Sequence, residues 1–143
     1  MFIGEYFHTI DAKKRLAVPV KFRKALEGKA VLTRGLDGCL YLYPVKEWKI
    51  MAEKLSQLPI GRADSRAFVR LMLAGAMEVS LDSLGRILVP DYLKEYAGMA
   101  KKAVVAGLYN RIEIWSEEKW ESYKQQTTKE VQAIAEKMHE LGI

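Results

Sequence analysis

A cluster of basic side chains near the start of the chain carries the clearest chemical signal in the sequence. Six cations fall within twelve residues and no acidic residue stands among them: Lys13, Lys14, Arg15, Lys21, Arg23 and Lys24. Ammonium and guanidinium groups bind phosphate through charge-assisted hydrogen bonds. The cluster flanks the apolar segment 16–20, LAVPV, so we expect a folded element to carry it. A fixed basic patch points to double-stranded nucleic acid as a partner, and an ordinary solvated surface is the alternative.

The two kinds of cation suit different contacts. Lysines suit backbone phosphates, which position a protein without reading sequence, and we assign this role to Lys13, Lys14, Lys21 and Lys24. A guanidinium matches O6 and N7 of guanine, so Arg15 or Arg23 is the candidate for reading bases. Four phosphate contacts predict a slope of about −3.6 for log K against log salt. The charge is concentrated in residues 1–75, which carry 14 basic and 7 acidic residues, against 9 and 11 in the remainder.

The sequence also repeats itself once. Residues 11–26 read DAKKRLAVPVKFRKAL and residues 82–97 read DSLGRILVPDYLKEYA, with Asp, Arg, Val and Pro in register. The match resumes between GLDGCLYLYPVKEW and GLYNRIEIWSEEKW further along each copy. Chance is a poor explanation for so many matches in order. We therefore expect two copies of one unit, repeat 1 at 5–47 and repeat 2 at 76–119.

Each copy predicts a hairpin, a short helix and a second hairpin. An Asp and an Arg bracket the first turn in both copies, where a carboxylate–guanidinium pair can hold it: Asp11 with Arg15, and Asp82 with Arg86. Gly85 suits a left-handed residue that closes a three-residue loop, and Lys14 takes that position in repeat 1 at a cost of about 1 kcal/mol. A proline then marks the helix start. A unit of this size is marginal alone, so we expect one pseudo-symmetric domain.

The rest of the chain is predicted to be helical. Residues 48–75 form a helical connector, and 120–143 form a C-terminal helix that belongs to the same compact unit. We expect the tail to begin at Glu117 with Ser116 as its cap and to run to about Leu141. An apolar stripe lies along it: Val131, Ile134, Ala135, Met138 and Leu141. Such a stripe is typical of a core or subunit contact, so the tail is a candidate assembly element.

Several function classes find no support in the sequence. The single Cys39 excludes an internal disulfide, and with His8 and His139 it makes no metal-ligand cluster. We expect Cys39 and His8 to be structural. No nucleophile stands with a base and no glycine loop cradles phosphate, so we expect no catalytic residue, no cofactor and no enzyme activity. The sequence shows no leader and no membrane span, which favours a cytoplasmic protein.

The pattern Asp-x-x-x-Arg, an apolar pair, Pro and a short amphipathic helix resembles the SpoVT–AbrB family of bacterial DNA-binding proteins. Two tandem copies opening with MFIGEYFHTIDAKKRLAVP resemble the MraZ family of transcriptional regulators. The resemblance implies an α+β fold, a SpoVT–AbrB-like barrel of interleaved β-hairpins with peripheral helices. It further implies a homo-oligomeric ring that binds direct repeats in a promoter, usually as a repressor. The family's genes stand at the head of cell-division and cell-wall clusters, so the resemblance implies a nucleoid-associated protein.

The two copies differ in the charges that surround the motif arginine. Arg15 stands among other cations, whereas Arg86 has Asp82, Asp91 and Glu95 close by. We therefore expect the first hairpin to face DNA and the second pair to be chiefly structural. One alternative is an antitoxin-like or other protein-binding module of the same fold class. Another is a purely structural ring, which concentrated cations would disfavour through repulsion.

Overall fold

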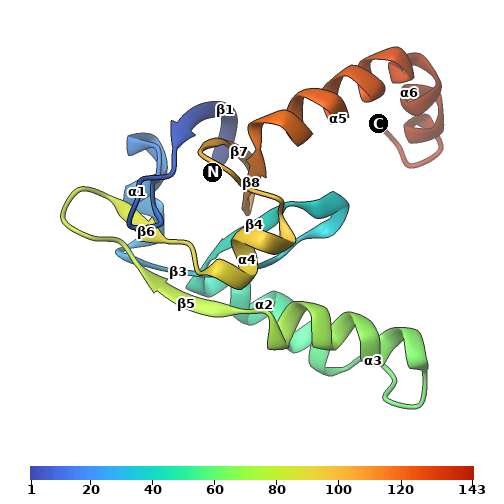
Figure 1. Ribbon diagram of the computed structural model, residues 1–143. Coiled ribbons are helices and arrows are strands. Elements are labelled where there is room, and N and C mark those ends of the chain that lie inside the picture. Colours follow the sequence, from blue (N-terminus) through green and yellow to red (C-terminus); the bar gives the residue numbers. More distant parts are fainter.

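The computed structural model describes residues 1–143 as an α+β protein, which confirms the expected fold class (Figure 1). The first repeat contains β1 (Phe2–Thr9), β2 (Arg15–Ala17), α1 (Val20–Leu26), β3 (Lys29–Arg34), a 3-10 turn (Leu36–Gly38) and β4 (Leu40–Pro44). The second repeat contains β5 (Met77–Ser80), β6 (Arg86–Leu88), α4 (Asp91–Tyr96), β7 (Lys102–Tyr109) and β8 (Ile112–Ser116). Between them lie α2 (Val45–Ser56), α3 (Ala63–Val69) and a π-helical turn (Arg70–Ala74). The chain ends with α5 (Glu117–Lys129) and α6 (Val131–His139).

Six strands form one antiparallel sheet in the order β1–β7–β8–β4–β3–β5. Strand β1 of the first repeat pairs with β7 of the second, and β5 of the second pairs with β3 of the first. The order is symmetric about the β8–β4 pair, so each repeat places its first strand in the other repeat's half of the sheet. This exchange confirms the expected interleaved, pseudo-symmetric arrangement. Strands β1 and β5 remain edges, so the sheet does not close into a barrel by strand pairing.

The two remaining strands, β2 and β6, pair with each other as a short antiparallel ribbon with Leu16 opposite Ile87. The expected hairpin within each repeat is therefore wrong in detail. Strand β1 meets its own β2 only at the bridge between Ile10 and Leu16, because the rest of β1 is paired with β7. The loops that join the strands of each copy nevertheless form as tight turns, and they stand at opposite ends of the ribbon.

Both faces of the sheet are buried along its four central strands, β7, β8, β4 and β3, and the alternation along β4 shows why. Leu40 and Leu42 point into a central core beneath the ribbon and the short helices α1 and α4. Tyr41 and Tyr43 point to the opposite face, where they join a second cluster with Trp115 from β8 and apolar residues of the helical connector. The central core fixes the ribbon, and through it the two turns, against the sheet.

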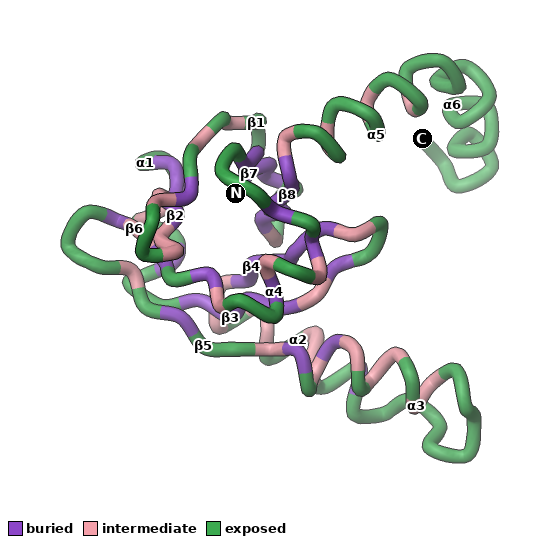
Figure 2. Tube along the Cα trace, in the orientation of Figure 1, coloured by how far each residue is buried: buried purple, intermediate pink, exposed green.

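Two helical arms extend from this body (Figure 1). The connector arm holds α2 and α3 and contributes Leu55 and Met72 to the second core. The C-terminal arm differs from the expected single helix because it breaks at Glu130, whose φ of −106° and ψ of 7° interrupt the helix. The β-branched pair Thr127 and Thr128 just before the break has low helix propensity. Every residue of α6 is exposed (Figure 2).

Candidate nucleic-acid interface

The first turn, residues 11–15, is held by one carboxylate. Oδ1 of Asp11 accepts the backbone N–H groups of Lys13 and Arg15, both at 2.9 Å, and Oδ2 accepts Nε of Arg15 at 3.1 Å. The N–H of Lys14 donates to the Asp11 carbonyl at 3.0 Å. Lys14 has a φ of 63°, so it takes the left-handed position that the sequence predicts. The backbone N–H of Arg15 is the main cause of a lowered pKa at Asp11.

The second turn, residues 82–86, has the same construction. Oδ1 of Asp82 accepts the N–H groups of Leu84 and Arg86 at 2.9 Å, and Oδ2 accepts Nε of Arg86 at 2.8 Å. Gly85 occupies the left-handed position with a φ of 73°. The Arg86 backbone N–H is the main cause of a lowered pKa at Asp82. The structure therefore brings each predicted Asp and Arg pair together as a clamp on a rigid turn.

The two arginines of these clamps differ in what else they contact. Nη1 of Arg86 lies 3.8 Å from Oδ2 of Asp11, so this guanidinium links the two repeats across the ribbon. The Arg15 side chain has no interaction beyond its own clamp, which leaves both of its Nη groups available. The difference agrees with a structural role for Arg86, and the assignment of Arg15 to DNA stays a prediction.

The six predicted cations do not stand equally free. Nζ of Lys14 forms an ion pair with Asp91 of the second repeat at 2.7 Å. Nε of Arg23 donates to the Val18 carbonyl at 2.8 Å. Apart from Arg15, which pairs with Asp11, the other three cations are exposed and have no ion-pair partner: Lys13, Lys21 and Lys24. The pairing of Lys14 with Asp91 could not be predicted from the repeat, since the two residues stand at non-equivalent positions of different copies.

The ribbon places each turn beside the helix of the other repeat. The N–H of Val89, just before α4, donates to the carbonyl of Lys14 in the first turn at 2.8 Å. The N–H of Val18, just before α1, donates to the carbonyl of Gly85 in the second turn at 2.9 Å. The cations of α1 therefore stand beside the second turn, although in the sequence they follow the first turn. The sequence analysis did not predict that β2 and β6, the strands that precede the two prolines, pair with each other across the repeats.

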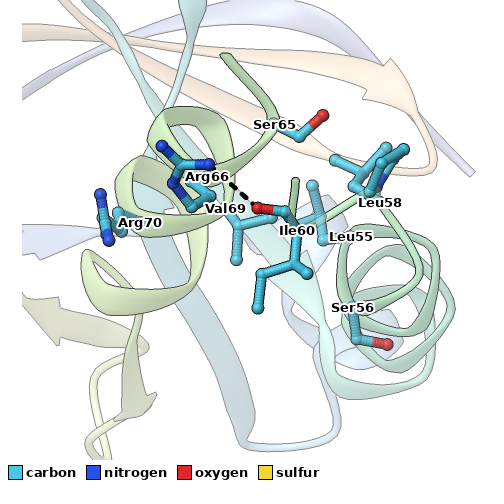
Figure 3. A pocket seen from close by; sticks show the side chains of 9 residues that line it. Leu55, Ser56, Leu58, Ile60, Ser65, Arg66, Val69 and Arg70 are labelled. Atoms are coloured by element: carbon cyan, nitrogen blue, oxygen red, sulfur yellow. Dashed lines mark hydrogen bonds between the residues drawn. The ribbon is translucent and has the colours of Figure 1, made fainter. Parts of the chain in front are cut away.

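A shallow groove lies on the surface away from the two turns. It has a volume of about 240 Å³ and lies between α2 and α3, where Arg66 Nη1 donates to the Ile60 carbonyl at 3.0 Å (Figure 3). Its lining combines apolar side chains with two serines and two arginines. No group of three or more His, Cys, Asp or Glu side chains is placed to hold a metal. Burial raises the pKa of the Cys39 thiol, and burial followed by the nearby Arg23 charge lowers the pKa of His8. None of the helices has the length and apolar character needed to cross a bilayer.

Comparison with known proteins identifies the family. The profile of the family described as "MraZ protein, putative antitoxin-like" matches the chain twice, over residues 1–71 and 72–141. The chain belongs to the MraZ family. Its MraZ relatives include proteins of Clostridium acetobutylicum, 54% identical over 143 residues, and of Clostridium beijerinckii, 52% identical over 143 residues. A third, from Moorella thermoacetica, is 51% identical over 143 residues. All three alignments cover 100% of both chains, and each relative is named Transcriptional regulator MraZ.

Proposed function

We propose that this chain is a transcriptional regulator that binds double-stranded DNA sequence-specifically, acting as a repressor at promoter direct repeats of a cell-division and cell-wall gene cluster. The observation that carries the DNA-binding proposal is the rigid first turn with Lys13 and Arg15 held outward on it. The names of the relatives support the regulatory role, and the resemblance implies the target genes. The proposed protein is cytoplasmic, nucleoid-associated and not an enzyme.

The proposed DNA contacts are of two kinds, phosphate contacts that position the protein and a base contact that reads the sequence. Lys13, Lys21 and Lys24 are exposed and unpaired, so each can neutralise a phosphate. The Asp11 carboxylate fixes Arg15 through Nε at 3.1 Å and leaves its Nη groups to donate to O6 and N7 of one guanine. A side chain already held in one conformation loses less rotamer entropy on binding, which favours a defined base contact.

Substitution of Arg15 tests this proposal. We expect Arg15→Ala to abolish preference for promoter DNA over a scrambled duplex in a fluorescence anisotropy titration. A lost bidentate contact is worth about 1–3 kcal/mol, or roughly 5- to 150-fold in affinity. The fold should persist because Asp11 keeps its two backbone hydrogen bonds. Lys124→Ala, which removes a cation of α5 that is ion-paired with Glu5 at 3.0 Å, is the matched control. Equal preference in the Arg15 variant and the parent would refute the assignment.

We further propose that the protein assembles into a homo-oligomeric ring, because two apolar surfaces of the chain are uncovered. On α6, Val131 is 50% exposed and Leu141 beyond it is 74% exposed. On the connector, Ile60 beside the groove is 84% exposed. The two surfaces have complementary charges. The connector surface, residues 60–70, carries three arginines and one aspartate, whereas the α6 surface, residues 130–143, carries three glutamates and one lysine. We infer that α6 of one copy occupies the groove of the next. Such a head-to-tail contact can close a ring.

A mixing experiment tests this contact. Ile134→Glu should disable the α6 face and Ile60→Glu should disable the groove, so light scattering should find a monomer in each case. Mixed together, the two variants retain one competent contact between them and should give a dimer that grows no further. A mixture that stays monomeric, or a parent protein that is itself no larger than a dimer, would overturn the head-to-tail contact. The ring then raises the avidity of weak single contacts with repeated DNA sites.

The family description also suggests an alternative to the homo-oligomeric ring. An antitoxin-like module would use the apolar face of α6 to hold a different protein in place of a second copy. The mass of the particle purified from its own cells separates the two cases. A multiple of the chain mass favours the ring, and a stoichiometric second protein favours the antitoxin-like module.

A further inference from the structure

The second turn presents an apolar side chain where the first presents a cation. Leu84 stands in repeat 2 at the position of Lys13 in repeat 1. Its side chain is 61% exposed, although its backbone is fixed by the N–H that donates to Oδ1 of Asp82 at 2.9 Å. A rigid turn that holds a leucine out in water gains nothing from core packing. The residue is therefore free to contact a partner.

The charges around Leu84 indicate the chemistry of that partner. Next to it, a Cβ on Gly85 would overlap the Arg23 guanidinium, so this cation from α1 lies directly against the second turn. Nε of Arg23 is held by the Val18 carbonyl at 2.8 Å, while its Nη groups have no partner in the chain. Lys21 and Lys24 lie on the same short helix and are exposed. An apolar tip beside cations matches the major groove, where phosphates flank the methyl group of thymine.

We propose that the second turn is a second DNA-reading element, in which Leu84 contacts a thymine methyl group while Arg23 contacts the adjacent backbone. This inference rests on the proposed DNA-binding function and adds a DNA contact in repeat 2 beside the Asp82–Arg86 pair, which we expect to be chiefly structural. In the ribbon, Arg15 is opposite Leu88 and Ala17 is opposite Arg86. Lys13 and Leu84 are therefore separated by about six residue steps, or at most about 20 Å. One subunit thus reads two positions within about six base pairs.

Replacement of thymine by uracil, which removes only the methyl group, tests this contact. We expect the affinity of the parent protein for promoter DNA to fall about fourfold at one thymine within six base pairs of the guanine that Arg15 reads. Leu84→Ala should bind thymine and uracil duplexes equally at that position while keeping its preference for the guanine. Leu36→Ala, which truncates a leucine that is 49% exposed on the turn between β3 and β4, is the matched control.

The outcomes separate this inference from the function on which it rests. If no uracil substitution weakens the parent protein while Arg15-dependent specificity persists, the Leu84 contact is overturned and the proposed function stands. If the Leu84 variant keeps the uracil effect, another residue makes the contact and the inference is again overturned. If the parent protein binds no promoter duplex at low salt, the proposed function itself fails. Thermal melting of the Leu84 variant, whose side chain is largely exposed, should match the parent.

Discussion

Replacement of Asp91 by asparagine should strengthen the proposed DNA binding, because the Asp91 carboxylate pairs with a lysine that we propose to bind phosphate. Its Oδ2 lies 2.7 Å from Nζ of Lys14, and this hydrogen bond is the main cause of a lowered pKa at Asp91. With Lys14 engaged, three unpaired lysines remain: Lys13, Lys21 and Lys24. Each phosphate contact contributes about −0.9 to the slope of log K against log salt. The lysines therefore contribute about −2.7 per subunit to the slope, in place of the −3.6 expected from four free lysines.

In Asp91→Asn, Lys14 becomes free and the slope should steepen by about 0.9 per subunit. Between 200 and 50 mM salt, the variant should gain about 3.5-fold more affinity than the parent gains. Fluorescence anisotropy titrations at four or five salt concentrations measure both slopes. Glu5→Gln removes the same charge from an ion pair between β1 and Lys124 of α5 and should leave the slope unchanged. Equal slopes for the parent and Asp91→Asn, or equal steepening in both variants, would refute the reasoning.

Two further predictions concern the stability of the second turn. The pKa of Asp82 is lowered in the folded protein, so its ionised form stabilises the fold above the ordinary carboxyl pKa and this stability is lost as pH falls below it. Urea unfolding should thus show Asp82→Asn to be less stable than the parent at pH 7, with the difference shrinking near pH 3. Gly85→Ala should cost about 1–2 kcal/mol, because φ is 73° and the new methyl group collides with Arg23. The equivalent change at Gly61, which has open space around it, should be nearly neutral in a thermal melt.

The repeat in the sequence predicted most of the fold, because equivalent residues face equivalent environments. The register of Gly85 with Lys14 predicted a left-handed residue at both turns, and both have positive φ. A repeat does not say which copy a strand pairs with. The contacts of Lys14 with Asp91 and of Arg23 with the second turn follow from that exchange, so neither could be predicted.

Local patterns beyond the repeat were less informative. Helical periodicity continues across Glu130, although the weak helix formers before it end α5 there. The apolar stripe of the tail correctly indicated an amphipathic helix, but periodicity alone does not distinguish a face that packs on the core from one left uncovered. Exposure in the three-dimensional structure made that distinction for Ile134 and Met138, each 37% exposed.

The exchange of first strands between the repeats has a consequence for how such a protein evolves. A dimer of two identical chains must present two identical turns, so it favours a palindromic site. Here β1–β7 and β5–β3 pairing joins two halves of one polypeptide, and each half can acquire its own residues without altering the other. One end of the ribbon carries Lys13 and the other carries Leu84. Under the proposed function, the chain would therefore bind DNA in a defined orientation and distinguish the two directions of a site, which a symmetric homodimer cannot do.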